Sequence, residues 1–160
     1  MIVGVDKIDH SAYIKAAAAE AAKWEKYKDR IYFGFDDTKR DNFFSDRLWL
    51  FKKNPMDVAI NLLNEYAKGK AVYGNGISSD LLVIGGFTGT FKDSVEAEKQ
   101  GRVQLNYIWT LDSHDSMQDF LALGVRGIMT NEPITLQRAL QPYLANGARM
   151  ARPEDPLRIP

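Results

Sequence analysis

Aromatic and polar side chains follow two successive apolar runs between residues 103 and 133, where they could bind a ligand. Tyr107 and Trp109 stand near the end of the run VQLNYIWTL, Asp112 follows it, and Asn131 follows the next run, VRGIMT. An indole at the end of a strand can bind a quaternary ammonium group through its π face, worth roughly 0.5–2 kcal/mol. A core tryptophan packed between a strand and a helix is the other interpretation. The residue types therefore predict either a pocket for a cation or a structural tryptophan.

Other side chains suited to chemistry are few. His10 and His114 are the only histidines, and their spacing matches no motif that places two metal ligands on one helical face. Asp36 and Asp37 could ligate Mg²⁺, although adjacent acids after a strand also serve as helix caps. Residues 74–76 (Gly-Asn-Gly) lack the glycine spacing and the Gly-Lys-Ser/Thr ending of phosphate-binding loops, so they predict a turn. These residues offer no complete metal or acid–base site.

Alternating strand and helix patterns must position the candidate residues. Runs of β-branched and aromatic residues predict strands, and runs of Ala, Leu, Glu and Lys behind a capping residue predict helices. The predicted strands are residues 2–5, 30–37, 70–78, 103–111 and 125–130, and the predicted helices are residues 11–28, 55–68, 91–101, 113–123 and 134–146. Residues 81–90 fit either a strand or an apolar loop. Five βα units are therefore expected.

Residues at the helix ends predict where each helix begins and stops. Ser11 or Asp9 is expected to cap the first helix, and Asn54, with Pro55 after it, the second. Gly69 is expected just past the end of the second helix. Asp112 or Ser113 is expected to cap the fourth helix, which Gly124 closes.

Strands that alternate with helices at intervals of roughly 30 residues are typical of βαβ units and a parallel sheet. Two architectures fit: an open doubly wound sheet, or part of a (β/α)₈ barrel, whose complete form needs about 250 residues. The length of 160 residues favours the open sheet. In both architectures ligands bind at the C-terminal ends of the strands, where Trp109, Asp112 and Asn131 are expected.

The composition is that of one soluble globular domain, with 45% hydrophobic and 26% charged residues. Lys plus Arg equals Asp plus Glu, at 21 each, so no net charge attracts nucleic acid or an anionic membrane. The absence of Cys excludes a disulfide scaffold and thiolate metal sites. The N-terminal apolar run is too short for a signal peptide or a transmembrane segment. Residues 146–160, rich in Pro and charge, predict a surface tail.

The segment YIWTLD, followed by a helix and LGVRGIMTNEP, resembles the glycerophosphodiester phosphodiesterase superfamily. The ending IMTN, with Asn131 where the ordinary phosphodiesterases usually have Asp, is more similar to the branch of sphingomyelinase D and related phospholipase D toxins. IDHSAYIKAA, FGFD and YGNGISS agree in order, so the resemblance covers nearly all of residues 1–145. The resemblance implies the C-terminal five-eighths of a (β/α)₈ barrel, strands four to eight, in place of the open sheet. Residues 1–145 are then a partial barrel domain and residues 146–160 a tail.

The resemblance also implies the residues that line the site. Trp109 matches the tryptophan that faces the choline head group, and Tyr107 the aromatic residue before it. Asp112 matches an acid that steadies the tryptophan loop, and Asn131 the polar group after the last strand. No catalytic residue is carried over, because His10 and His114 match neither catalytic histidine. The ligands of the expected Mg²⁺ ion belong to the missing N-terminal strands.

This sequence also departs from the family pattern. Arg126 replaces the usual Asp of Gly-Val-Asp-Gly, Glu132 replaces an aromatic residue before Pro133, and Ser79 stands where many toxins have Cys. The Asn-Glu-Pro change lies next to the expected pocket. It weakens the prediction of toxin-like substrate choice.

The function implied is that of the C-terminal portion of a Mg²⁺-dependent phospholipase D or sphingomyelinase D-like phosphodiesterase, secreted, that cleaves choline phospholipids. One alternative is a glycerophosphodiester phosphodiesterase that acts on small diesters. LLVIGGF at 81–87 is either an interfacial loop that would favour lipid or a buried segment. The other alternative is a non-catalytic half-barrel that binds a partner or self-associates through its open sheet edges. The chain alone is predicted to be inactive.

Overall fold

The computed structural model describes residues 1–5, 8–35, 55–76, 87–155 and 157 of the chain. The strands are β1 (Ile2–Val5), β2 (Tyr32–Phe35), β3 (Tyr73–Gly76), β4 (Asn106–Trp109) and β5 (Gly127–Ile128). The α-helices are α1 (Ser11–Ala21), α2 (Pro55–Tyr66), α3 (Phe87–Lys99), α4 (His114–Leu123) and α5 (Pro133–Ala145). Short 3-10 turns at Ile8–His10 and Lys28–Arg30 precede α1 and β2. Each described strand is followed by an α-helix, as the sequence predicts.

All described strand pairs are parallel, which confirms the predicted βαβ pattern. β1 pairs with β2, and β3, β4 and β5 form a second ladder in that order. A parallel bridge between Phe33 and Ala71 joins the two ladders. At this bridge Phe33 N donates to Lys70 O and Val72 N donates to Phe33 O, each at 2.9 Å. The described strands are therefore neighbours in chain order, from β1 to β5, without a reversal.

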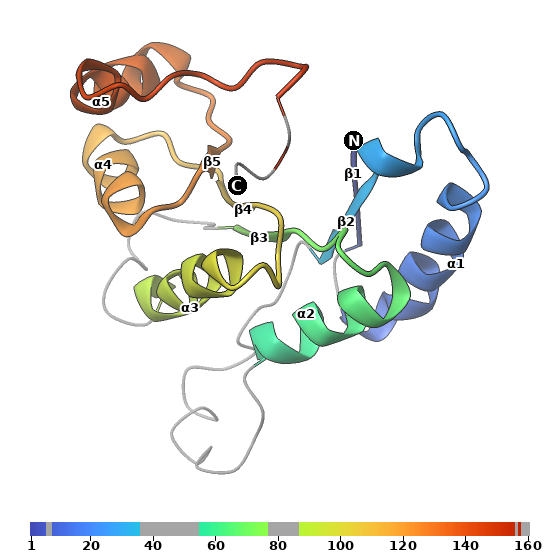
Figure 1. The fold of residues 1–160 in the computed structure, drawn as a ribbon. Helices are drawn as coiled ribbons and strands as arrows, with labels where there is room; N and C mark the ends of the chain where they lie inside the picture. The colour runs from blue at the N-terminus through green and yellow to red at the C-terminus, as the bar shows by residue number, and fades with distance from the viewer. Residues whose placement is uncertain (6–7, 36–54, 77–86, 156, 158–160) are drawn as a thin grey trace, which may run out of the picture.

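The helices lie along one side of the strands. Figure 1 shows α1 to α5 in an arc that surrounds the five strands from outside. Successive residues of a strand point to opposite sides of the sheet, and Phe33, Tyr73 and Ile108 belong to the core beneath the helices. The alternate positions form the opposite side, called the inner face below: Gly34, Gly74, Gly76, Tyr107, Trp109 and Gly127.

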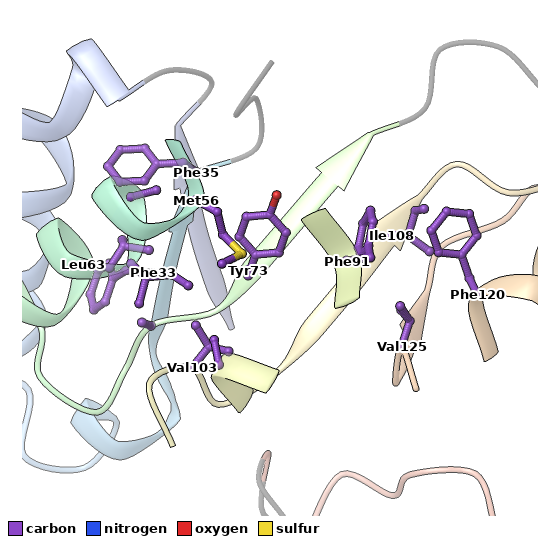
Figure 2. Close-up of a cluster of buried hydrophobic side chains, with 14 of the residues drawn as sticks. Phe33, Phe35, Met56, Leu63, Tyr73, Phe91, Val103, Ile108, Phe120 and Val125 are labelled. Atoms are coloured by element: carbon purple, nitrogen blue, oxygen red, sulfur yellow. The ribbon is translucent and has the colours of Figure 1, made fainter. Parts of the chain in front are cut away.

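The core between the strands and the helices is built from aromatic and branched side chains. Phe91 of α3 is fully buried, and its ring meets the rings of Tyr73 and Phe120 edge to face, with centroids 6.0 and 5.1 Å apart. Such pairs contribute about 0.5–1.5 kcal/mol each beyond the burial of apolar area. Figure 2 shows this core running from Phe33, Phe35 and Leu63 at one end to Phe120 and Val125 at the other. One continuous core thus joins the described βα units.

The first helix is shorter than predicted. The expected helix over residues 11–28 ends at Ala21. Ile14 and Ala18 are buried in the core, whereas Trp24, beyond the helix end, is exposed. High helix propensity does not extend a helix far in water unless one of its faces is packed. The unpacked residues instead turn towards β2.

Local capping chemistry predicts α2 better than α1. His10 is the N-cap of α1 and makes no side-chain capping hydrogen bond, so the prediction of Ser11 or Asp9 is wrong. Pro55 is the first residue of α2, as expected, and Gly69 follows the helix with a φ of 72°. The left-handed conformation favours glycine at such a position. Asn54, the predicted cap of α2, lies outside the described residues.

The region around β3 and α3 also differs from the prediction. Residues 74–76 belong to β3, within the predicted strand over residues 70–78, so the prediction of a turn at Gly-Asn-Gly is wrong. α3 begins at Phe87, which assigns residues 87–90 to a helix, whereas residues 81–86 lie outside the described part. β4 is confined to Asn106–Trp109, shorter than the predicted strand over 103–111. These glycines pair with β4, and their lack of side chains leaves room for two rings on the inner face, described below.

The last two helices agree with their local signals. Ser113 Oγ accepts a hydrogen bond from Ser116 N at 3.2 Å and caps α4, and Gly124 closes the helix with a φ of 93°. Both were predicted and are confirmed. α5 begins at Pro133, one residue earlier than predicted, because proline suits the first turn of a helix. No helix in the described ranges is both long and apolar enough to span a membrane.

The residues after α5 fold back on the domain. The Arg149 guanidinium donates to both carboxylate oxygens of Asp155, at 2.6 and 2.7 Å. These bonds, together with the backbone N–H of Arg152, lower the pKa of Asp155 to about 2. Arg126 Nη2 donates to Leu157 O at 3.1 Å. The predicted surface tail therefore makes specific contacts both within itself and with the start of β5.

Candidate functional site

The rings of Tyr107 and Trp109 lie over glycines of the neighbouring strand. The register of β3 and β4 sets Gly74 opposite Tyr107 and Gly76 opposite Trp109. A Cβ atom added at Gly74 would lie 2.1 Å from Tyr107 Cζ, and one at Gly76 would lie 2.6 Å from Trp109 Cη2. Only glycine leaves room for rings at these positions. The two aromatic residues therefore share the inner face, with their rings flat across β3.

The two rings differ in how accessible they are. Tyr107 is only 4% exposed. Gly127 of β5 leaves room for it, because a Cβ atom added at Gly127 would lie 2.6 Å from Tyr107 Cβ. Trp109, nearer the C-terminal end of β4, is partly exposed. Tyr107 thus serves as a packed support, and Trp109 is the ring of this pair that a ligand can reach.

Asp112 fastens the loop after β4 to the end of β5. Its Oδ1 accepts from Asn131 N at 2.8 Å and from Thr130 Oγ1 at 3.0 Å, and its Oδ2 accepts from Asn131 Nδ2 at 3.0 Å. Thr130 Oγ1 in turn accepts from Glu132 N at 2.8 Å. The bonds from Asn131, with that from Thr130, lower the pKa of Asp112. A carboxylate with three donors is held in its charged form, and it holds the loop that carries Trp109.

The structure therefore brings the four predicted residues together in two pairs. Tyr107 and Trp109 lie on the inner face, and Asp112 and Asn131 lie directly beyond the strand ends. The backbone N and the side-chain Nδ2 of Asn131 both donate to Asp112, so the first role of Asn131 is to fix the shape of the loop. Glu132, at the family's aromatic position, is exposed at the start of α5.

A buried polar network that the sequence did not reveal anchors β4 from its helix side. Asn106 is fully buried, its Nδ2 donates to Glu98 Oε2, and its backbone N donates to the same oxygen at 3.1 Å. Arg126 pairs with Glu98 Oε1, and Arg126 N donates to Asn106 Oδ1 at 3.2 Å. Arg126 Nη2 also donates to Gln104 O at 3.0 Å. Arg126, which replaces the family's Asp, thus has an acidic partner on α3.

One signal in the sequence pointed to this network. Asn106 is a polar residue between the apolar Leu105 and Tyr107 of a strand expected to be buried, and a buried amide requires partners. Which partner it takes depends on how α3 packs on β4. The identity of Glu98 was therefore not predictable from the local pattern.

Neither histidine belongs to the inner face that carries Tyr107 and Trp109. His10 is exposed before α1, with its ring 6.1 Å from that of Tyr13. His114 is the first residue of α4, and its Nδ1 lies 3.3 Å from Asp115 Oδ1. Within the described ranges, no three His, Cys, Asp or Glu side chains gather into a group that could hold a metal ion. The candidates Asp36 and Asp37 lie outside those ranges, as do Ser79 and most of the LLVIGGF segment.

This geometry suits binding more than bond cleavage. A partly exposed indole lies on the inner face at the C-terminal end of its strand, beside a loop fixed by a charged carboxylate. Ligands of parallel α/β folds bind at this end of the strands. The accessible ring of Trp109 is of the kind that can bind a cationic group, and none of the four residues has the arrangement of a nucleophile with its base.

Known proteins resemble this chain along most of its length. The family model described as "Dermonecrotic toxin SPH" matches residues 1–156. Dermonecrotic toxin LlSicTox-alphaIV3 of Loxosceles laeta is 28% identical over 159 residues, which cover 97% of this chain and 52% of the toxin. Dermonecrotic toxin LiSicTox-alphaII1 of Loxosceles intermedia is 43% identical over 61 residues, 38% of this chain and 20% of the toxin. The chain spans about half the length of the first of these curated relatives.

Among solved structures, a putative glycerophosphoryl diester phosphodiesterase from Silicibacter pomeroyi aligns with 86% of this chain and 57% of its own. The sequence identity is 11% and the TM-score is 0.33. A superposition at this level carries no inference about this chain.

Proposed function

The chain belongs to the dermonecrotic toxin SPH family, and we propose that it forms the C-terminal portion of a phosphodiesterase that cleaves choline phospholipids. Membership confirms the sequence-based assignment to the toxin-like branch, which was made chiefly on YIWTLD and LGVRGIMTNEP. The reaction itself, cleavage of a phosphodiester with release of the choline head group, is what the resemblance implies for the complete protein. The same resemblance implies that the complete protein is secreted.

The strand order supports a barrel portion over an open doubly wound sheet. A doubly wound sheet reverses its strand order at one point, and the ligand binds there. The described strands run from β1 to β5 in chain order, and the helices follow one side (Figure 1). This is the arrangement of successive βα units in a (β/α)₈ barrel. The fold we propose is therefore the C-terminal five-eighths of that barrel.

The observation that carries the proposed function is the indole at the C-terminal end of β4. Trp109 is partly exposed, whereas Tyr107 on the same face is buried. Asp112 accepts hydrogen bonds from Asn131 and so holds the loop that follows β4. In the proposed enzyme Trp109 binds the trimethylammonium group of choline through its ring face. Asp112 and Asn131 keep the loop in place while the head group enters and leaves.

A magnesium ion is expected from the family, but the described residues do not fit a magnesium cage. Mg²⁺ is held by carboxylate and other oxygen ligands, and the described ranges bring together no cluster of three acidic or histidine side chains. We therefore assign none of the described residues to the metal, and Asp36 and Asp37 lie outside them. The proposed ligands belong to the N-terminal strands of the complete protein.

The test is choline release by the protein at its natural length. The intact mass of the protein from its native source shows whether further βα units accompany this chain. Choline released from lysophosphatidylcholine is then measured for the protein and for its Trp109→Ala variant. Release that Trp109→Ala strongly reduces supports the proposal. A protein with the complete barrel that releases glycerol phosphate from small diesters but no choline from lipid would favour the glycerophosphodiesterase alternative.

A second candidate function, self-association, is favoured by the sheet edges. Among the described residues, β1 pairs only with β2, and β5 pairs only with β4. Unpaired strand edges favour pairing with another chain. If the 160-residue chain is the natural product, we expect light scattering to show an oligomer. A strictly monomeric chain would count against this candidate.

A further inference from the structure

We infer that Gly76 is a positioning residue that seats the Trp109 indole flat on β3 and so sets the direction from which a cationic head group meets the ring. The inference rests on the proposed function for the identity of the cation. The seating itself is a property of the strand register. Gly76 makes no contact with the cation in this proposal; it acts through the ring.

The distances show that the ring lies over Gly76 with its face, not its edge. A Cβ at residue 76 would lie 2.6 Å from Trp109 Cη2, and 2.7 Å from both Cζ2 and Cζ3. Near-equal distances to three adjoining ring atoms place that Cβ above the six-membered ring. Real Cβ atoms essentially never come within 3.0 Å of a heavy atom outside their own residue and its chain neighbours. Any side chain at residue 76 would therefore force the indole off the strand.

The same relation recurs one step earlier on the strand pair. A Cβ at Gly74 would lie 2.1 Å from Tyr107 Cζ and 2.5 Å from both Cε atoms, which places it over the tyrosine ring face. Both inner-face positions of β3 are thus glycine where both inner-face positions of β4 are aromatic. The pattern forms a flat aromatic shelf, made of Tyr107 and Trp109 on a floor of Gly74 and Gly76.

This seating determines which face of the indole a ligand can use. The β3 backbone at Gly76 covers one face of Trp109, and the side chain is only partly exposed. The part that stays accessible is turned away from β3, towards the inner side of the sheet. A cation binds over a ring face within about 6 Å of the ring centroid. The orientation of the accessible face, and hence the position of the cation, depends on the absence of a side chain at residue 76.

The experiment follows the Trp109 fluorescence of the full 160-residue chain. Trp24 and Trp49 are replaced by Phe, which leaves Trp109 as the single tryptophan of the three. Tetramethylammonium chloride is titrated against this protein, with sodium chloride as the salt control. Gly76→Ala is expected to shift the emission maximum and to weaken tetramethylammonium binding by about 2- to 30-fold, the range that a cation–π contact spans.

Gly34→Ala is the matched control on a neighbouring strand. Its Cβ would meet Val72 Cγ2 at 3.2 Å, Val72 O at 3.3 Å and Tyr107 Oη at 3.9 Å, and none of these nearest atoms belongs to Trp109. It tests the general effect of an alanine in a strand of the inner face. We expect it to leave both the emission maximum and the tetramethylammonium affinity of the parent protein unchanged.

The outcomes separate the positioning role from the proposed function. An unchanged emission maximum together with unchanged affinity in Gly76→Ala overturns the inference. If Gly76→Ala shifts the emission maximum but the parent protein binds no tetramethylammonium, the result supports the seating of the ring and contradicts the proposed head-group site.

If Gly76→Ala folds poorly, the urea midpoint of the chain provides the second test. The loss caused by Gly76→Ala is expected to be largely restored when Trp109→Leu is added, because the smaller side chain removes the collision. A double variant as unstable as Gly76→Ala alone overturns the inference.

Discussion

Replacing Asn106 by Ala is expected to destabilise the domain, because the amide joins a buried carboxylate to the start of β5. The change removes the bond from Asn106 Nδ2 to Glu98 and the bond from Arg126 N to Asn106 Oδ1. A hydrogen bond to a charged group contributes about 1.5–3 kcal/mol and a neutral one about 0.5–1.5 kcal/mol. The free energy of unfolding should therefore fall by about 2–4.5 kcal/mol. The backbone N of Asn106 retains its bond to Glu98.

Urea unfolding, followed by circular dichroism, measures this change. With a slope of about 2 kcal/mol per molar urea, within the usual range of roughly 1–3, the midpoint should fall by about 1–2 M at constant slope. Asn146→Ala is the matched control, because Asn146 is exposed at the end of α5 and donates to Pro142 O. A surface substitution of this kind usually changes the free energy of unfolding by no more than about 0.5 kcal/mol. Equal midpoints for the two variants would refute the assignment of Asn106 to a stabilising network.

Asn106→Asp tests the charge in the same network. The new carboxylate would stand beside Glu98, and two carboxylates in contact resist being ionised together. We expect this variant to be less stable than Asn106→Ala at pH 7, and to recover part of the loss at pH 5, where the pair can share a proton. A loss that is independent of pH would show that Glu98 is not charged or not adjacent.

The other expectations concern the site and the tail. In the complete enzyme, Trp109→Ala should reduce turnover of choline lipids about 2- to 30-fold more than that of ethanolamine lipids, whereas equal loss would make the residue structural. The 160-residue chain alone should release no choline from lysophosphatidylcholine in the presence of Mg²⁺, and measurable release would contradict this. Asp112→Ala removes the acceptor of Asn131 N and should accelerate deuterium exchange of that amide, but not of the capped amide of Ser116. The pKa of Asp155 is lowered to about 2, so its contribution to stability is complete above the ordinary value of 3.8 and is lost as the pH falls towards 2. A carboxyl titration by NMR with a midpoint near 3.8 would contradict the Arg149 pair.

The placement of Trp109, Asp112 and Asn131 at the strand ends was predictable because these residues lie close together in the sequence. Trp109 and Asp112 flank the end of one strand, and Asn131 follows the next, so the βα pattern alone places them at one edge of a parallel sheet. The caps of α4 were predictable for the same reason, since Ser113 and its partner are three residues apart. The end of α1 was not, because helix propensity continues past the point where packing stops.

The sequence by itself determined the alternation of strands and helices, the family, and the identity of the residues at the end of β4. Each of these depends on neighbours along the chain, on residue propensity and on the 2.0 and 3.6 periodicities. Only the tertiary structure decided that Gly74 and Gly76 lie beneath two rings, and that Arg126 pairs with Glu98. The physical reason is that these pairs join different elements. Their contacts exist only once the register of β3 with β4 and the packing of α3 on β4 are set.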